Sequence, residues 1–315
     1  MKLHTEHFVT IALVIACGCS GGSSDTTEAT GTSSASSSAS GTPASSASGT
    51  PASSASGAGG ASSAASTSSG ETPSGTGGAT GDGGVSGCTG LQFCEDFESY
   101  PTGEVATAAM LGPWKAAVAN ATMAVDGTKP HSGKNSLHIT AMAGAAAHGT
   151  LTQTVAKGLI PGNNLFGRTM LFYSDTGGNG LPLGVHSWIF NASGTSTEAK
   201  GNVTMNLGGG GAKLQINYHP PAPLTEQSVQ GGTMTAGAWH CVQWQYDGSG
   251  TPVKNDAKVW VDGMLAVEAP ASKGWNFATP WSTFDFGFTH YQTLMNGIDV
   301  YLDDFALDEK MIPCP

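Results

Sequence analysis

The tract from residue 20 to residue 87 limits what this chain can fold into. It contains no aromatic residue, no lysine and no arginine, and its acidic residues are Asp25, Glu28, Glu71 and Asp82. Such a stretch cannot bury enough apolar surface to offset the entropy lost on ordering. We therefore expect a disordered linker over 20–87 and one folded domain over 88–315, whose 228 residues hold all seven tryptophans and suit a single all-β sandwich.

The linker contains an internal repeat. The octad GTPASSAS occurs at 41–48 and again at 49–56, within a tract rich in Ser, Ala, Gly and Thr. This composition is typical of a flexible spacer with occasional stiffening by proline. A random coil of this length has a root-mean-square reach of roughly 45 Å, which would hold a domain clear of a cell surface.

The first 19 residues predict an export signal and anchor. A short polar start precedes the apolar run 8–16, which is too short to span a bilayer. The segment Val14-Ile15-Ala16-Cys17 resembles a bacterial lipobox, whose cysteine would be acylated, and Cys19 is the competing site. The alternative is an ordinary signal peptide without lipidation. Acylation would anchor the protein on the outer side of a membrane through lipid only.

The charge of the folded part excludes nucleic acid as a partner. Removing Lys2 and the five acids before residue 88 leaves 11 basic and 18 acidic side chains, a net charge of −7. A duplex-binding surface needs clustered Lys and Arg, whereas Arg168 is the only arginine in the chain.

Four cysteines remain once the N-terminal pair is set aside, and an even set is typical of an exported protein. Three pairings are open, of which we favour Cys88 with Cys94, at the domain entrance, and Cys241 with Cys314, near the C-terminus. A zinc site is the alternative, but the sequence has no Cys-x-x-Cys or Cys-x-x-His pair.

The apolar residues of 88–315 alternate with polar ones, and turn residues interrupt them about every ten positions, which predicts strands rather than helices. A hairpin loop is expected between Gly248 and Asp256, and a tight turn at 261–264. The expected strands are Ser136–Thr140, Thr150–Thr154, Arg168–Ser174, His186–Asn191, Asn202–Leu207, Lys213–His219, Trp239–Tyr246, Lys258–Val261, Thr283–Thr289 and Val300–Leu307.

Three of these strands carry amides on their polar face. Alternation turns Val, Met, Leu, Ile and Trp side chains one way and the amides the other. If the strands are neighbours, the amides line a groove suited to sugar hydroxyls; the alternative is the ordinary solvated face of a sandwich. A solvated face usually carries Lys and Glu, so we favour the groove. Its amides are Asn206, Gln215, Asn217, Gln243 and Gln245.

Several motifs together resemble a known group of proteins. They are FCEDFE at 93–98, SGKNSL at 132–137, GRTMLFY at 167–173, WHCVQW at 239–244, VWVDG at 259–263 and YLDDFAL at 301–307. In this order they resemble a concanavalin A-like lectin/glucanase jelly roll. More narrowly, they are similar to the core domain of fungal cellulose-induced proteins and to glucuronan and alginate-type polysaccharide lyases. The resemblance covers essentially all of 88–315 and implies two stacked, curved antiparallel sheets.

The resemblance also implies a structural calcium ion. Calcium prefers oxygen ligands from several chain segments, and the first and last strands of such sandwiches commonly lie side by side. The positions that match are Glu98, Ser132, Asn135 and either Asp303 or Asp304. The alternative is a set of surface polar residues without an ion.

A jelly-roll lyase layout assigns roles to five residues. Uronan lyases neutralise the uronate carboxylate, remove the neighbouring proton and protonate the leaving oxygen. Arg168 is the candidate neutraliser and His186 the candidate base. Tyr218 or His219 would be the acid, and Gln243 would help to hold the carboxylate.

Other catalytic patterns are missing. The Glu-x-Asp-x-x-Glu strand motif of laminarinase-like hydrolases and the Gly-x-Ser-x-Gly elbow do not occur in the sequence. Trp188, which shares its strand parity with His186 and Phe190, is either part of a packed row or a stacking platform for sugar rings.

The function we expect is that of a monomeric, surface-anchored lipoprotein whose jelly roll binds polysaccharide. An active uronan lyase that cleaves by β-elimination is the first alternative. A non-catalytic module for adhesion or protein recognition is the second.

Overall fold

The computed structural model describes residues 88–154, 159–175, 186–196, 199–210, 213–277, 280–293 and 296–315. The expected signal and anchor over 1–19, the linker over 20–87 and the acylation candidates Cys17 and Cys19 lie outside these residues. Within the described ranges, no helix has the length and apolar composition needed to cross a membrane.

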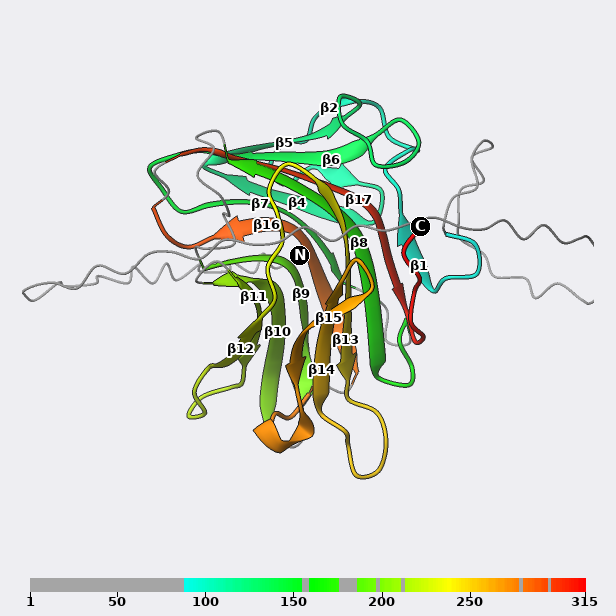
Figure 1. Ribbon diagram of the computed structural model, residues 1–315, viewed down its shortest axis with the longest axis vertical. Helices are drawn as coiled ribbons and strands as arrows, with labels where there is room; N and C mark the ends of the chain where they lie inside the picture. Colours follow the sequence, from blue (N-terminus) through cyan, green and yellow to red (C-terminus); the bar gives the residue numbers. More distant parts are fainter. Residues whose placement is uncertain are drawn as a thin grey trace, which may run out of the picture. The chain divides into compact units, whose positions relative to one another are not determined.

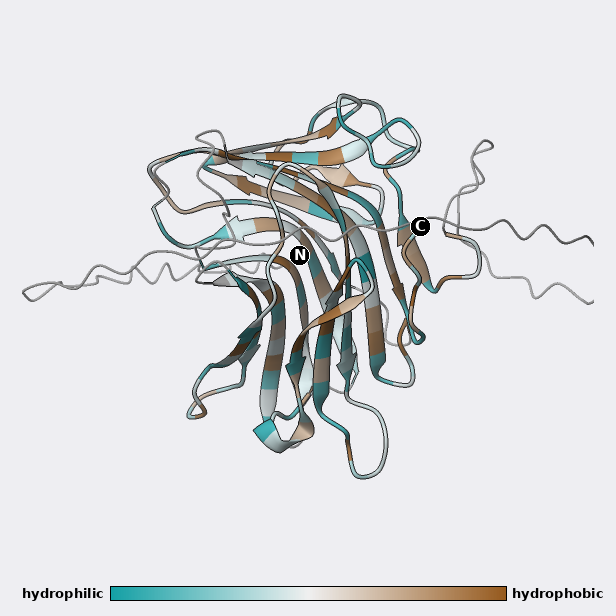
Figure 2. Cartoon of the chain, in the orientation of Figure 1, coloured by the Kyte–Doolittle hydropathy of each residue, from teal (hydrophilic) through white to brown (hydrophobic). Residues whose placement is uncertain are grey.

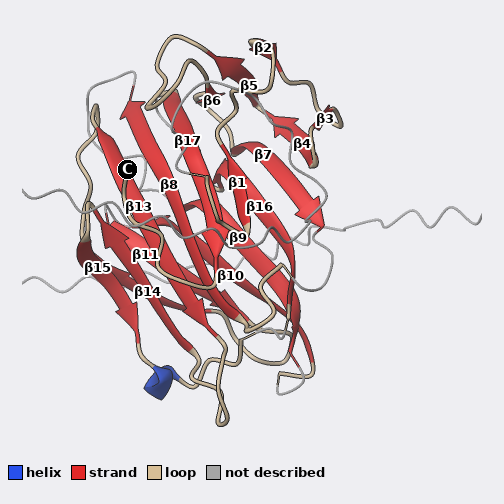
Figure 3. Ribbon diagram, turned by 90° about the vertical axis from the view of Figure 1, so that its right-hand side faces the viewer, coloured by secondary structure: helices blue, strands red, loops and turns tan. Residues whose placement is uncertain are grey.

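Two antiparallel sheets form the domain (Figures 1 and 3). The nine-stranded sheet has the order β15 (Met264–Ala269), β14 (Asp256–Val261), β13 (Trp239–Asp247), β8 (Asn164–Asp175), β17 (Ile298–Asp308), β6 (Ser136–Ala141), β5 (Ala121–Asp126) and β2 (Gly103–Glu104), with β1 (Phe93–Glu95) paired to β17. The eight-stranded sheet has the order β12 (Gln227–Gly231), β11 (Lys213–His219), β10 (Gly201–Gly210), β9 (Ser187–Ser196), β16 (Trp281–His290), β7 (Ala147–Thr154), β4 (Trp114–Ala119) and β3 (Met110–Leu111). A short 3-10 turn, η2, covers Ala271–Lys273.

This architecture confirms the predicted two-sheet antiparallel jelly-roll sandwich. Each strand turns one set of alternate side chains into the space between the sheets, and the bands of colour along the strands in Figure 2 follow this alternation. The core is rich in aromatic side chains from both sheets. The Phe190 and Trp244 rings lie 4.6 Å apart and those of Phe286 and Phe305 4.1 Å, so aromatic packing joins the two layers.

All ten predicted strands are present, and most extend by one to five residues beyond the predicted ends. The turn at 261–264 joins β14 to β15 as a tight hairpin, with Asp262 at φ 50° and Gly263 at φ 78°, the positive φ pair that such hairpins require. The strands that the sequence analysis missed are β1 to β5, β12 and β15. Of these, β4 and β5 contain several alanines, which carry little β propensity.

Both favoured disulfide bonds are confirmed. Cys88 bonds to Cys94, and Cys241 on β13 bonds to Cys314 near the C-terminus. The second bond fixes the residues after β17 on the outer face of the nine-stranded sheet.

Candidate functional site

A row of polar side chains crosses the outer face of the eight-stranded sheet. Its members occupy matched positions on seven neighbouring strands, from β4 through β7, β16, β9, β10 and β11 to β12, and the strands that they come from lie side by side in Figure 1. With strands about 4.8 Å apart, the row is roughly 29 Å long. We call it the polar row: Lys115, Thr152, Asp285, Asn191, Asn206, Asn217 and Ser228.

A second line of small hydroxyl side chains runs beside the polar row. Thr283, Ser193 and Thr204 are register partners on β16, β9 and β10, and His219 on β11 pairs with Thr204. The hydroxyls of Ser193 and Thr204 are hydrogen bonded at 2.9 Å. The face therefore presents neutral hydroxyl and amide groups in neighbouring lines, the chemistry that hydrogen bonds to sugars.

The three asparagines of the polar row lie on an outer face and are nevertheless mostly buried. Asn191 is 9% exposed, Asn206 8% and Asn217 3%. The Oδ1 atoms of Asn191 and Asn206 have no hydrogen-bond partner among the described residues. A buried acceptor without a donor is unfavourable and is normally paired, so these oxygens mark positions where water or a ligand is expected to donate.

Asp285 stands at the centre of the polar row. Its Oδ1 accepts a hydrogen bond from Thr152 Oγ1 (2.6 Å), and its Oδ2 accepts one from Asn191 Nδ2 (2.8 Å). Both donors come from adjacent strands, so the carboxylate is held in one orientation. Each oxygen retains lone pairs for a further donor.

One end of the polar row carries two histidines. Asn217 Nδ2 donates to His186 Nε2 (2.8 Å) and to Glu226 Oε1 (3.1 Å), while Asn217 Oδ1 accepts from Gln215 Nε2. Asn217 thus ties β11 to the segments before β9 and β12. Burial lowers the pKa of His219, and His186 lowers it further, although Glu226 acts in the opposite direction.

Trp188 reaches this face because of a β-bulge. Phe190 pairs with Leu207 and Trp188 pairs with Gly208, so Ile189 is the extra residue between them. The bulge separates the two aromatic residues, leaving Phe190 in the core and turning Trp188 outward. A Cβ at Gly208 would lie 1.8 Å from the main-chain oxygen of Ser187, which explains the glycine at this crossing.

Tyr291 continues the aromatic part of the face. Its hydroxyl accepts a hydrogen bond from Trp188 Nε1 (2.7 Å), its ring centroid lies 5.3 Å from that of His186, and the side chain is 54% exposed. Trp188 is only 9% exposed, so the Tyr291 ring is the surface on which a sugar ring could stack.

The expected five-amide groove is divided between the sheets. Asn206, Gln215 and Asn217 are neighbours on β10 and β11, but Gln243 and Gln245 lie on β13 in the other sheet. The inward residues of β13, Val242, Trp244 and Tyr246, belong to the core, so the glutamines face away from the polar row. Gln243 Nε2 donates to the main-chain oxygen of Ile312 (2.6 Å) and Gln245 Nε2 to Asn164 Oδ1 (2.9 Å).

The expected lyase residues are divided between the sheets as well, with Arg168 and Gln243 as register partners on β8 and β13 and the two histidines at the eight-stranded sheet. Arg168 lies on β8 and is 2% exposed. Its guanidinium donates to the main-chain oxygens of Asp304 and Pro313. Burial lowers its pKa, and Asp304 partly counteracts this shift. Tyr218 faces the core, where it stacks on Trp275. Of the expected catalytic set, only His186 and His219 lie at the polar row.

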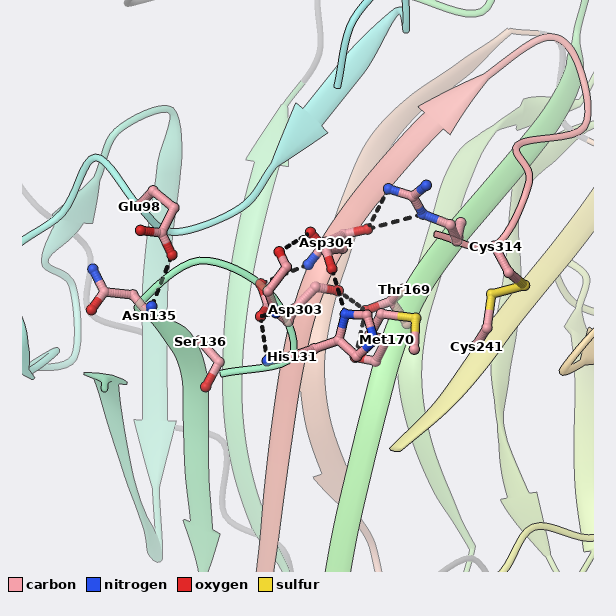
Figure 4. A network of polar contacts seen from close by, with 12 residues as sticks. Glu98, His131, Asn135, Ser136, Thr169, Met170, Cys241, Asp303, Asp304 and Cys314 are labelled. Carbon is pink, nitrogen blue, oxygen red and sulfur yellow. Dashed lines mark hydrogen bonds and ion pairs between the residues drawn. A yellow bond between two sulfur atoms is a disulfide. The ribbon is translucent and has the colours of Figure 1, made fainter. Parts of the chain in front are cut away.

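The expected calcium ligands form two separate groups, one at each end of the 131–135 turn (Figure 4). At one end, Asp303 Oδ2 accepts from the main-chain N of His131 (2.8 Å), and Asp304 accepts from Ser132 Oγ (2.8 Å). Burial and the neighbouring Asp304 raise the pKa of Asp303 to about 7. No group of three or more His, Cys, Asp or Glu side chains that could hold a metal occurs in the described part of the chain.

The other end of the turn offers oxygen atoms. Glu98 Oε1 accepts from the main-chain N of Asn135 (2.8 Å), and Asn135 Nδ2 donates to the main-chain oxygens of Phe97 (3.4 Å) and Tyr100 (3.2 Å). A carboxylate oxygen and two carbonyl oxygens are therefore gathered around Asn135, which donates to all three. This donor set is the type that Ca²⁺ prefers.

Asp285, at the centre of the polar row, was not among the predicted site residues. Asp285 lies in the predicted strand Thr283–Thr289 and alternates with Phe284 and Phe286, so its outward direction was available from the pattern. Its position opposite Asn191 was not, because register between distant strands is a property of the fold. Tyr291 and Glu226 follow or precede strands and had no periodic signal.

No model of a known protein family matches the chain, and no curated protein matches it. The similar solved structures include a cellulose-induced protein, Cip1, which is 16% identical over 71% of this chain and 100% of that chain, with a TM-score of 0.49. An endo-β-1,4-glucuronan lyase from the fungus Trichoderma reesei is 17% identical over 69% of this chain and 95% of that chain, with a TM-score of 0.48. The receptor binding domain of botulinum neurotoxin type G is 9% identical over 63% of this chain and 44% of that chain, with a TM-score of 0.37. The similarity to these proteins is one of fold.

Proposed function

We propose that this protein binds polysaccharide on the outer face of its eight-stranded sheet. The observation that carries the proposal is the polar row, in which three mostly buried asparagines stand side by side and two of their oxygens have no donor within the described ranges. Sugar hydroxyls supply donors and acceptors at short, regular spacing and match such a row. Tyr291, which is hydrogen bonded to Trp188, adds a stacking surface at its edge.

Affinity electrophoresis of the full chain in gels that contain a dissolved polysaccharide tests this function. Wild type is expected to be retarded by at least one neutral or uronic polysaccharide. Asn206→Ala and Asn217→Ala are expected to weaken binding about tenfold each, the effect of losing roughly 1.4 kcal/mol of hydrogen bonding. Gln245→Ala is the matched control, since it removes a half-buried amide from the outer face of the other sheet.

If the polysaccharide retards all three variants as strongly as the wild type, the binding site does not lie at the polar row. If no polysaccharide retards the wild type, the binding function is wrong, and retention on a protein ligand would instead support the adhesion alternative. Melting temperatures of the variants show whether a loss of binding reflects unfolding.

Elimination at uronate residues is a second candidate function. One contact, between His186 and Asn217, supports it. His186, the proposed base, lies between Asn217 and the Tyr291 ring, so an amide, an imidazole and a phenol occupy one end of the polar row. His186 Nε2 accepts from Asn217 and would have to release this bond to accept a proton. Ultraviolet absorbance of an unsaturated product, measured after incubation with glucuronan, alginate or glucuronoxylan, distinguishes turnover from binding, and His186→Ala should abolish it.

We also propose that the domain is exported and anchored through acylated Cys17 or Cys19. The two disulfide bonds support an oxidising compartment. Mass spectrometry of the membrane fraction, before and after substitution of each cysteine by serine, would identify the acylated residue.

A structural calcium ion is the last part of the proposal. Its support is the oxygen-rich end of the 131–135 turn, where Glu98 and Asn135 meet two main-chain carbonyl oxygens. The ion would join the segment after β1 to the loop before β6, and it takes no part in the binding chemistry.

A further inference from the structure

The centre of the polar row is rich in hydrogen-bond acceptors. Asp285 offers two carboxylate oxygens, and its neighbours Asn191 and Asn206 each carry an Oδ1 atom without a partner among the described residues. One N–H of the Asn191 amide donates to Asp285 Oδ2. Two buried amide oxygens without a described partner therefore lie beside a carboxylate whose oxygens each accept one hydrogen bond and can take a further donor. A ligand that satisfies them must supply O–H or N–H groups.

The charged groups around this centre also favour a ligand that donates hydrogen bonds. No Lys, Arg or His nitrogen in the described parts of the chain forms an ion pair with Asp285. Lys115, at the end of the polar row, is two strands away, or about 10 Å, and is exposed. The two histidines and Glu226 lie near Asn217, at the opposite end. The centre therefore carries an uncompensated negative charge.

We propose that the central subsite, formed by Asp285, Asn191 and Asn206, selects a sugar ring that donates hydrogen bonds and carries no carboxylate. Such a ring is that of a neutral sugar or an amino sugar. Its hydroxyl or ammonium hydrogens pair with the three sets of acceptors. A uronate ring brings a second carboxylate to Asp285, where like charges repel.

This inference rests on the proposed polysaccharide binding and sharpens it. Discrimination comes from Asp285, which favours donors and repels a uronate, so one residue sets the class of glycan. It also opposes the lyase alternative, because a lyase has to hold a uronate along the same row.

The experiment compares three hexasaccharides with the full chain by isothermal titration calorimetry: a neutral glucose or xylose oligomer, a glucosamine oligomer and a glucuronate oligomer. The variants are Asp285→Asn, which keeps the shape, and Asp285→Ser, which leaves room for water beside Thr152 and Asn191. Glu268→Gln on β15, an exposed site of the other sheet, is the control for the same change in net charge. Titrations at low and high salt add a test on the wild type alone.

The expected result is that wild type binds the neutral or the amino oligomer at least tenfold more tightly than the glucuronate oligomer. The gap should shrink about tenfold in both Asp285 variants and remain in Glu268→Gln, and high salt should narrow it in wild type, because salt screens charge repulsion. If the neutral oligomer binds more tightly than the amino oligomer, the subsite selects hydroxyl donors. If the amino oligomer binds more tightly, the subsite selects an ammonium group.

Two results would overturn the inference. One is equal or tighter binding of the glucuronate oligomer by wild type. The other is a ratio that neither salt nor any folded Asp285 variant changes. Failure of all three oligomers to bind would instead refute the polysaccharide-binding function itself, so the two failures are distinguishable.

Discussion

The guanidinium of Arg168 grips the main chain of Asp304, donating from Nε at 3.2 Å and from Nη2 at 3.1 Å to the same carbonyl oxygen. A third donor, Nη1, reaches the carbonyl oxygen of Pro313 at 3.1 Å. The chain's only arginine thus connects β8 to the bulge in β17 and to the C-terminal residues. Its contacts are those of a structural residue.

Arg168→Ala should destabilise the fold and leave glycan binding intact. The substitution leaves buried carbonyl groups without donors, so we expect the free energy of unfolding to fall by about 2 to 4 kcal/mol. Urea titration measures this loss, and affinity electrophoresis measures binding. Lys258→Ala, which breaks an exposed ion pair, should change stability by less than about 0.5 kcal/mol. If the Arg168→Ala variant is folded but no longer binds glycan, Arg168 belongs to the binding site and the prediction is wrong.

Gly208→Ala should disrupt the bulge that turns Trp188 outward. The new Cβ would lie 1.8 Å from Ser187 O and 2.4 Å from Trp188 Cα, and backbone of this kind cannot move aside cheaply. We expect a loss of about 3 kcal/mol or more, together with weaker glycan binding. Gly144→Ala is the control, because Gly144 has a positive φ and open space around it and should cost only about 1 kcal/mol. Equal losses for both variants would refute the close-contact explanation.

Removal of the disulfide between Cys241 and Cys314 should destabilise the domain more than removal of the one between Cys88 and Cys94. The two bonds close loops with sequence separations of 73 and 6 residues. Loop-closure entropy then gives about 4 kcal/mol for the longer loop and about 2 kcal/mol for the shorter one. Differential scanning calorimetry of the two Cys→Ser double variants compares them. A larger effect of the short loop would mean that native contacts dominate.

Acid should destabilise the domain through His290. The side chain is 1% exposed, and its Nδ1 lies 2.8 Å from Gln292 O. Burial lowers its pKa below the ordinary 6.5, although the hydrogen bond to Gln292 acts against this. The unfolded chain therefore takes up a proton at a higher pH than the folded protein does. Stability falls as pH decreases from about 6.5 through the folded-state pKa, and it is fully present above 6.5.

Melting curves between pH 8 and pH 4 test this titration. The decline should be shallower in His290→Gln than in wild type. His148→Gln, on the outer face of the eight-stranded sheet, should keep the wild-type slope. An unchanged slope in His290→Gln would assign the acid sensitivity to other groups.

Chelation should lower the melting temperature if the calcium proposal is correct. A structural ion that binds only the folded state adds stability by mass action, so EDTA removes it and added Ca²⁺ restores it. Glu98→Gln should melt lower than wild type in the presence of Ca²⁺ and should not respond to EDTA. Glu104→Gln, at an exposed position on β2, should respond as wild type does. If EDTA leaves the melting temperature of the wild type unchanged, the calcium proposal is wrong.

The sandwich could be predicted from the sequence because each strand carries its own alternation. Val203, Met205 and Leu207 turn inward as the pattern requires, and the turn at Asp262 and Gly263 follows from residues that tolerate positive φ. The grouping of strands into sheets could not be predicted in this way. β13 has the same amide pattern as β10 and β11, yet it pairs with β8 and β14.

The candidate site was therefore predicted only in part. Asn206, Gln215 and Asn217 were expected to share a face and do so, since each is a register partner or a near neighbour across two strands. Asp285 and Asn191 joined them through pairings between β9, β16 and β10 that depend on the whole topology. Trp188 required the bulge at Ile189, because simple alternation places it on the side of Phe190.

The register of the polar row has a consequence for how this protein can change over time. Seven strands each contribute one member, and on the four central strands, β16, β9, β10 and β11, both neighbouring positions lie in the core. A point substitution therefore alters one group and leaves the others in place. Deletion of one residue within β10 would exchange Asn206 for an apolar neighbour on the outer face and drive an amide into the interior. We expect lineages of this protein to vary the row by substitution and to confine insertions and deletions to the loops.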